Sequence, residues 1–124
     1  TLQLTATQIR AQLFNFFDVL SELHAVDLVE AGLDTFGKPA GYVLRQVDGW
    51  RRRWEDAITP DTVNCDATIK WLMDNMPAES GRASVIHNDY KMDNVIFSLQ
   101  DPLQVIGVLD WEMSTVGDPL MDLD

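Results

Sequence analysis

The sequence is short of positive charge, and this shortage excludes several kinds of partner. Nine Lys and Arg residues stand against twenty Asp and Glu residues in the 124-residue chain, so the formal net charge is -11. Nucleic-acid affinity comes largely from neutralising phosphates with basic side chains, which argues against a nucleic-acid partner. An anionic membrane surface is disfavoured for the same reason. A nucleotide stays possible where a divalent metal supplies the missing positive charge.

Cysteine and long apolar runs are also scarce. Cys65 is the single cysteine, so no intrachain disulfide can form. This fits a reducing compartment, and we expect a cytoplasmic protein. No run of about 18 apolar residues occurs, so we expect no membrane span. A basic segment followed by an apolar one is missing near the start, so no signal peptide is visible.

The end of the sequence looks like the start of a helix. Asp118 is suited to an N-cap and Pro119 to the first helical position. A helix normally continues for 8 to 20 residues, and the given chain stops at Asp124. We therefore expect it to be a piece of a longer protein.

The spacing of apolar residues predicts three helices in the first part of the chain. Thr5 or Thr7 is the expected N-cap of the first helix, and Pro39 is expected to open the second. The residues predicted to be buried are Ile9, Leu13, Phe16, Phe17, Leu20 and Leu23 in the first helix, Val43, Val47, Trp50 and Trp54 in the second, and Cys65, Ile69, Leu72, Met73 and Met76 in the third.

From Ala83 onward the pattern favours short strands. The segments "ASVIH", "NVIFS" and "QVIGVLDW" are β-like, and Asp101 with Pro102 gives a turn signal between the last two. A hairpin centred near Pro102 would place Val95 opposite Leu109 and Asn94 opposite Asp110. Opposed side chains in such a pair lie on one face, roughly 5 Å apart at Cβ. An amide oxygen and a carboxylate at that separation suit Mg²⁺, which takes one or two carboxylates plus substrate phosphates and water.

Two further side chains add the remaining parts of a phosphoryl-transfer site. Asp89 precedes Asn94 by five residues and can accept the proton of a hydroxyl held near a metal-bound phosphate. Lys91 can bring positive charge to the transferred phosphoryl group. A base, two metal ligands and a cation are what this chemistry requires, because it depends on positioning and charge stabilisation.

The order of these residues resembles a known superfamily. His87, Asp89 and Asn94 followed by Asp110 are similar to the catalytic-loop and metal-binding signatures of protein-kinase-like proteins. The segments "HNDYKMDN", "VLDWE" and "GDPLMDLD" resemble the aminoglycoside phosphotransferase family. Within that family, "GYVLRQVDGWRRRWE" is similar to the kinase-like domains related to those fused to acyl-CoA dehydrogenases. The resemblance covers nearly the whole chain and is sharpest from Ser84 to Asp124.

The resemblance implies a role for each of these residues. Asp89 would be the catalytic base. Asn94 and Asp110 would bind Mg²⁺ and, through it, the phosphates of ATP or GTP. His87 would brace the catalytic loop, and Asp122 would support that loop rather than touch substrate.

The resemblance also implies the fold class and the domain organisation. The expected fold is α+β, the mainly helical C-terminal lobe of a protein-kinase-like phosphotransferase with a small catalytic β-hairpin. Residues 1–82 would form a helical, acceptor-side part, and residues 83–124 the catalytic loop, the metal-binding hairpin and the start of a helix. The acceptor would be a hydroxyl of a small molecule, and other domains of the parent chain are possible partners.

The chain departs from the family pattern at several positions. Asn88 stands where the family usually has Gly; if a positive φ is required there, Asn is the next most tolerant residue. Trp111 and Glu112 replace the Phe-Gly of protein kinases, which argues against a protein-kinase activation loop.

The parts of the family's nucleotide lobe are missing from the sequence. No G-x-G-x-x-G occurs among its seven glycines. Its three lysines are Lys38, Lys70 and Lys91, and none lies in a strand like V-A-I-K. We therefore expect the N-terminal nucleotide lobe to lie outside this chain, and we expect the chain to be inactive alone.

Two other functions remain open on the sequence. A kinase-like binding or regulatory module without turnover would not need Asp89, Asn94 and Asp110. A metal-dependent phosphatase or nuclease would act without a nucleotide donor, and the acidic composition disfavours the nuclease.

Some residues also have simpler interpretations. Lys91 can be surface charge, and Asp118 is better explained as an N-cap than as a ligand. Arg51, Arg52 and Arg53 fit a solvated helix face with local ion pairs. In an alternative reading, Arg45 or this run binds an anionic substrate.

Overall fold

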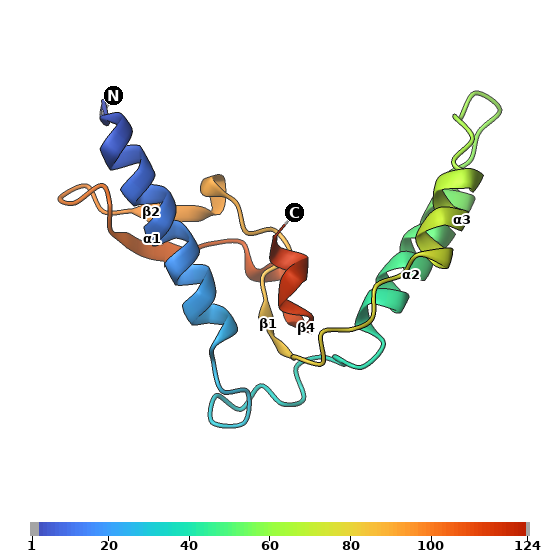
Figure 1. Ribbon diagram of the computed structural model, residues 1–124, viewed down its shortest axis with the longest axis horizontal. Coiled ribbons are helices and arrows are strands. Elements are labelled where there is room, and N and C mark those ends of the chain that lie inside the picture. The colour runs from blue at the N-terminus through green and yellow to red at the C-terminus, as the bar shows by residue number, and fades with distance from the viewer. Residues whose placement is uncertain (1–2, 124) are drawn as a thin grey trace.

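The fold combines three helices with two small antiparallel sheets (Figure 1), which confirms the predicted α+β class. It is known from a computed structural model that describes residues 3–123. Strand β1 pairs with β4, and β2 pairs with β3. The helices are α1 (Ala6–His24), α2 (Tyr42–Asp56) and α3 (Asp66–Asp74), and the strands are β1 (Ser84–Ile86), β2 (Val95–Phe97), β3 (Val105–Val108) and β4 (Thr115–Gly117).

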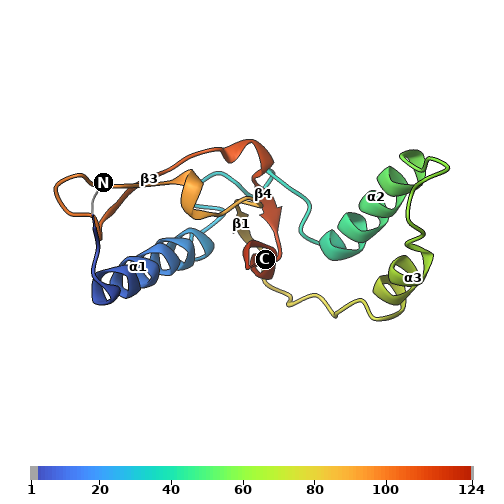
Figure 2. The ribbon, with the colours of Figure 1, turned by 90° about the horizontal axis from the view of Figure 1, so that it is seen from above.

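The elements divide into two groups in space. Helix α1 lies beside the strands and the C-terminal turn, while α2 and α3 project away from them as a helical pair (Figures 1 and 2). We call residues 42–74, which hold α2 and α3, the helical arm, and α1 with the four strands and residues 87–94 and 109–123 the central unit. The predicted division at residue 82 stays a prediction.

Helix α1 anchors the core of the central unit. Thr5 is its N-cap: the Thr5 hydroxyl accepts from the Gln8 amide at 3.3 Å, and the Gln8 side chain accepts from the Thr5 amide at 3.0 Å. This capping box decides between the two predicted caps. Phe16 and Leu20 of α1 are buried against Tyr90 and Val95. The Phe16 and Tyr90 ring centroids are 4.4 Å apart.

The predicted buried line of α1 is only partly correct. Ile9 is 47% exposed, Leu13 43% and Phe17 50%. The apolar stripe is wider than the surface that the strands cover, so its edges remain in contact with solvent.

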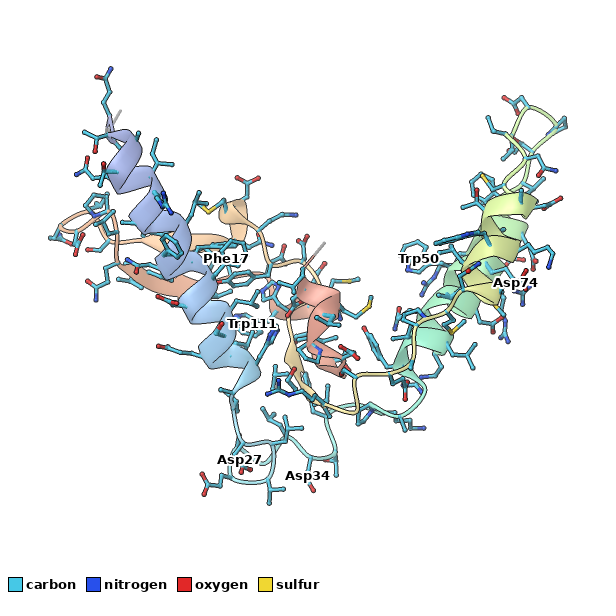
Figure 3. All side chains as sticks on the ribbon, viewed as in Figure 1. Phe17, Asp27, Asp34, Trp50, Asp74 and Trp111 are labelled. Carbon is cyan, nitrogen blue, oxygen red and sulfur yellow. The ribbon has the colours of Figure 1, made fainter. Side chains whose placement is uncertain are left out.

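The helical arm departs further from the predictions. Helix α2 begins at Tyr42 after Gly41, which has φ 70°, and not at Pro39. Trp50, predicted to be buried, is 62% exposed (Figure 3). Tyr42 is the buried residue of α2, and α3 has none. In α3, Leu72 and Met73 were predicted to be buried and are exposed. Within the described chain, α2 packs mainly against α3, so most of the surface of each helix has no cover.

The strands were predicted in place, but the hairpin register was wrong by one residue. Val95 pairs with Val108 rather than with Leu109, and a bulge lies between Ile96 and Phe97. Asp110 therefore lies beyond the ladder instead of opposite Asn94. A bulge adds an unpaired residue, which a symmetric count of residues around the turn does not anticipate.

Strand β4 and the final turn complete the central unit. The sequence did not predict β4, which pairs with β1 from Ser84 to Ile86. Asp118 is the N-cap of a 3-10 turn at Pro119–Asp122, as predicted for that residue. Across residues 3–123, no helix combines the length and apolar character that crossing a membrane requires.

Candidate active site

The loop from His87 to Asn94 is held in place by a buried carboxylate. Asp122 is 5% exposed. Its Oδ2 accepts from the His87 amide at 2.9 Å, and its Oδ1 accepts from the Asn88 amide at 2.6 Å. These backbone groups would otherwise lose their hydrogen bonds on burial, so the carboxylate fixes the path of the loop.

Helix α1 is joined to the same carboxylate. His24 Nε2 lies 2.8 Å from Asp122 Oδ2, across 98 positions of the sequence. The sequence analysis missed this contact because neither residue carries a local signal of the other. Asp122 therefore connects the loop, the C-terminal 3-10 turn and α1.

Asn88 has the backbone conformation that its position in the motif suggested. Its φ is 62°, in the left-handed region that Asn tolerates better than most residues. Its side chain donates to the Met113 carbonyl at 2.9 Å and accepts from the Tyr42 hydroxyl at 3.2 Å. Burial raises the pKa of Tyr42, so this phenol stays protonated and can donate. The Tyr42 contact connects the loop to the helical arm, and the sequence analysis did not single out Tyr42.

His87 ties the loop to the segment that leads to Asp110. It is fully buried, and its Nε2 lies 2.8 Å from the Leu109 carbonyl. A carbonyl oxygen only accepts, so Nε2 carries the proton and donates. The ring also packs against Trp111, with centroids 4.8 Å apart. This geometry agrees with the bracing role that the resemblance implies for His87, a role that stays a prediction.

Asp89, Lys91 and Asn94 form one hydrogen-bonded group. The Asn94 amide nitrogen donates to Asp89 Oδ2 and to the Asp89 carbonyl, both at 2.9 Å. Lys91 Nζ donates to the two Asp89 carboxylate oxygens at 2.8 and 2.9 Å. The Lys91 contact is the main cause that lowers the pKa of Asp89 below its usual value, with the Asn94 amide assisting. Asp89 is therefore ionised at neutral pH, and Asn94 directs its nitrogen toward it.

Asp110 lies beside this group. The Leu109 amide donates to the Asn94 carbonyl at 2.8 Å, so Asp110 follows directly on the residue bonded to Asn94. The carboxylate is exposed. Hydrogen bonding to Asp89 is the main cause that raises the pKa of Lys91, and the charges of Asp110 and Asp93 add to it. Asp110 therefore stands close enough to Lys91 for its charge to act there.

The backbone at Asp110 has a positive φ, as it does at Asn88. Asp110 has φ 67°, and in the described chain it and Asn88 are the non-glycine residues with positive φ. Such conformations cost free energy and cluster at functional sites, where surrounding contacts hold them.

The side-chain oxygens of Asn94 and Asp110 suit Mg²⁺, which needs few protein ligands, better than a metal that is coordinated entirely by protein side chains. Asn94 and Asp110 offer an amide oxygen and a carboxylate, which are hard oxygen ligands. Within residues 3–123 no three His, Cys, Asp or Glu side chains gather in a way that could hold a metal. A cation here would need phosphates or water to complete its coordination, which is how Mg²⁺ is commonly bound.

A cleft of about 520 Å³ adjoins the loop. One wall comes from α2 and includes Tyr42, Arg45 and Trp50. The other comes from the central unit and includes Asn88 and Thr115. Because Asn88 lines the cleft and is the neighbour of Asp89, a molecule in this cleft would lie next to the His87–Asn94 loop.

The fold is that of a kinase-like phosphotransferase domain, and comparisons with known proteins agree. The chain belongs to the phosphotransferase enzyme family, whose model matches residues 2–123. This confirms the resemblance read from the sequence.

Curated relatives include acyl-CoA dehydrogenase family members. The chain is 39% identical to acyl-CoA dehydrogenase family member 11 of Gallus gallus over 114 residues, which is 92% of this chain and 14% of that protein. It is 39% identical to family member 10 of Mus musculus over 85% of the chain and 10% of the relative. The chain therefore spans about a seventh or less of the length of these relatives.

Solved structures with the same fold include phosphotransferases. A Ralstonia eutropha protein assigned to the aminoglycoside phosphotransferases matches 99% of this chain and 37% of its own, with 31% identity and a TM-score of 0.89. The streptomycin–ATP–APH(2")-IIa ternary complex matches 96% of this chain and 41% of its own, with 20% identity and a TM-score of 0.64. The second likeness supports the fold alone.

Proposed function

We propose that the intact protein containing this chain transfers the γ-phosphate of ATP or GTP to a hydroxyl of a small molecule in the presence of Mg²⁺. The observation that carries the proposal is the Asp89–Asn94 hydrogen bond at 2.9 Å. This bond places the Asp89 carboxylate, whose pKa is lowered, beside the Asn94 amide. Because the amide nitrogen is used in the bond, the amide oxygen can bind a cation. Membership of the phosphotransferase enzyme family supports the same chemistry.

Each side chain of the site would have a different role in the reaction. Asp89 would orient the acceptor hydroxyl and take its proton as the oxygen bonds to phosphorus. Asn94 and Asp110 would hold Mg²⁺, which when bound neutralises the charge of the nucleotide phosphates. The Lys91 side chain is half exposed and forms an ion pair with Asp89. Its ammonium group can therefore leave that carboxylate and bind a phosphate oxygen. His87 and Asp122 would keep the loop in its working conformation.

The setting of the chemistry is also part of the proposal. The nucleotide would be covered by a lobe outside this chain, and the helices up to Met76 would help to form the acceptor side. Other domains of the parent protein are plausible partners, since the curated relatives are several times longer. The single cysteine supports a reducing, cytoplasmic location.

The test is Mg²⁺-dependent ADP formation by the intact protein with a panel of hydroxylated metabolites. Asp89→Asn should lower turnover by about 10²- to 10⁴-fold, the usual contribution of a positioned base. Asp93→Asn is the matched control, because it makes the same change of charge at an exposed residue of the same loop. Removal of Mg²⁺ with a chelator should abolish turnover.

Three outcomes would contradict the proposal. Full turnover in Asp89→Asn would show that Asp89 is not the catalytic base. Nucleotide or ligand binding without turnover in the unmodified protein would favour a binding or regulatory module. Phosphate release from a phosphoester with no nucleotide donor would favour a phosphatase.

A further inference from the structure

The cleft beside the catalytic loop has an unusual charge for this protein. Lys38, Arg45 and Arg53 line it, and no Asp or Glu is among its lining residues in the part of the chain that the structure describes. The chain as a whole has more than twice as many acidic as basic residues. Three of the nine basic residues of the chain therefore line one cleft that no described Asp or Glu lines.

The arginines of α2 fall into two sets. Arg51 and Arg52 form ion pairs with carboxylates of their own helix: Arg51 with Asp48 and Glu55, and Arg52 with Asp48. Lys38, Arg45 and Arg53 form no ion pair with any carboxylate in residues 3–123. Of the arginines of α2, the two without an ion pair in residues 3–123, Arg45 and Arg53, are the ones that line the cleft.

The two cleft arginines are also held by their neighbours. The Arg53 guanidinium lies 4.8 Å from the centroid of the Trp50 ring, a cation–π arrangement on an exposed helix face. Arg45 donates to the backbone carbonyls of Lys38 and Ala40 and lies 6.0 Å from the Tyr42 ring. These contacts restrict the side chains while leaving their positive charge without a counter-ion.

We propose that the acceptor bound in this cleft carries a negatively charged group, a carboxylate or a phosphate. The side chains of Arg53, Lys38 and Arg45 bind this group. The inference rests on the proposed function, because it names the class of acceptor for that site. Planar guanidinium groups bind carboxylate and phosphate with paired hydrogen bonds, which makes arginine the expected residue for either group.

The sign of the charge separates this site from an aminoglycoside site. Aminoglycosides carry several protonated amines, so a pocket that binds them needs acidic or neutral partners. A streptomycin complex is among the proteins with this fold, yet the cleft described here would repel such a polycation. The fold is shared, but the electrostatics of this cleft favour an acceptor of opposite charge.

The positions of the cations also suggest that the acceptor is elongated. Tyr42, at the loop end of the cleft, and Arg53 are separated by about 16 Å along α2, since an α-helix rises 1.5 Å per residue. An acceptor whose hydroxyl lies near Asp89 and whose charge reaches Arg53 must span much of that length.

The experiment compares acceptors of matched structure and different charge in the intact protein. ω-Hydroxy carboxylates of two to twelve carbons are assayed for Mg²⁺-dependent ADP formation beside the corresponding diols, amino alcohols and hydroxyalkyl phosphates. Streptomycin and kanamycin are included as polycations. We expect turnover with one or both anionic series, with the carboxylate and phosphate arms showing which group is preferred.

Variants of α2 test the residues themselves. Arg53→Gln should raise the KM for the best anionic acceptor by about ten- to a hundredfold, the range for loss of a charged hydrogen bond, with kcat nearly unchanged. Arg52→Gln is the matched control: it removes the adjacent arginine of the same helix, which pairs with Asp48 at 2.7 Å, and should leave KM unchanged. Lys38→Gln should raise KM without altering the backbone contacts that Arg45 makes.

Two results would overturn the inference while leaving the proposed function intact. One is a best acceptor that is neutral or cationic. The other is an anionic acceptor whose KM responds equally to Arg53→Gln and Arg52→Gln.

Direct binding separates failure of this inference from failure of the kinase proposal. The same compounds are titrated against Asp89→Asn protein by calorimetry, which needs no turnover. Binding of the anionic series that weakens in the Asp89→Asn/Arg53→Gln double variant supports the inference even where no acceptor is phosphorylated. Equal binding of all charge classes, or none, overturns it.

Discussion

The central unit and the helical arm are built on different kinds of contact. In the central unit, Asp122 bonds to residues 34, 35 and 98 positions away in the sequence. In the arm, the ion pairs join residues three or four positions apart on a single helix, as between Lys70 and Asp74. Tyr42 is the buried residue of α2, and α3 has none.

In the proposed function, this difference separates the part that would set the chemistry from the part that would select the acceptor. Long-range hydrogen bonds to buried groups hold the His87–Asn94 loop in one conformation, which the proposed phosphoryl transfer would require for positioning. The arm is joined to that unit at Tyr42 and Asn88, and its exposed residues can change with little effect on the fold.

Loss of the Asp122 carboxylate should cause the largest structural effect. Asp122→Ala removes the acceptor of the His87 and Asn88 amides and of His24, and leaving such groups buried without partners costs about 3 kcal/mol. Hydrogen–deuterium exchange of the peptide containing residues 84–94 should become much faster. As a control, Asp74→Ala removes an exposed carboxylate from the arm and should leave that exchange unchanged. Equal effects of the two variants would contradict the contrast.

Loss of Lys91 should affect activity and its pH dependence. Lys91→Gln should lower kcat/KM by about ten- to a hundredfold, because it removes positive charge beside the transferred phosphoryl group. Lys91 is the main cause of the lowered pKa of Asp89, so that pKa should rise in the variant. Protonated Asp89 cannot accept a proton, so the acid limb of the pH–rate profile should move to higher pH.

The control for Lys91 is Lys70→Gln, in which an exposed lysine of the arm is changed. Its profile should match that of the unmodified protein. An unshifted acid limb in Lys91→Gln would assign Lys91 to the surface and not to the site.

The Asp118 cap should contribute a smaller and pH-dependent stability. Its carboxylate accepts from the Leu120 amide at 3.0 Å and the Ser80 amide at 3.1 Å, and an N-cap is worth about 1 kcal/mol. The Ser80 hydrogen bond is the main cause that lowers the pKa of Asp118.

A lowered folded-state pKa means that this stabilisation is complete above the unfolded pKa of about 3.9 and disappears as the pH falls through the folded value. Urea denaturation at neutral pH should show Asp118→Ala to be less stable, with Asp118→Asn intermediate. The difference between Asp118→Ala and the unmodified protein should shrink toward pH 3. A difference independent of pH would show that the charge contributes nothing.

The smallest effect is expected in the arm. Trp71 is 61% exposed, and substitutions at exposed positions usually change stability by less than about 0.5 kcal/mol. Trp71→Ala should therefore leave the denaturation midpoint and the ADP-forming activity almost unchanged. A loss above about 1 kcal/mol would mean that other parts of the intact protein cover α3.

The features that sequence reasoning predicted are local ones. The Thr5 cap and the Asp118 cap are decided by residues within three positions, and each has a chemical signature. The loop motif from His87 to Asn94 likewise lies in eight consecutive residues. A positive φ at Asn88 was compatible with the sequence, because Asn tolerates this conformation next best after the Gly that the family usually has there.

The features that were missed depend on distant partners. The His24–Asp122 contact joins residues 98 positions apart, and nothing near either one indicates the other. The hairpin register shifted because a bulge at Ile96 and Phe97 has no periodic signal. Trp50 was predicted to be buried because a helical stripe shows which residues share a face, but not whether another element covers that face.

In the proposed function, Asn94 and Asp110 hold a magnesium-bound nucleotide next to Asp89. The direct test is calorimetric titration of the intact protein with ATP, with and without Mg²⁺, in Asn94→Ala, Asp110→Ala and the hairpin-turn control Asp101→Asn. The account predicts that both site variants lose about tenfold or more of the Mg²⁺-dependent affinity, while the control binds like the unmodified protein. Unchanged Mg²⁺-dependent binding in Asn94→Ala and Asp110→Ala would contradict it.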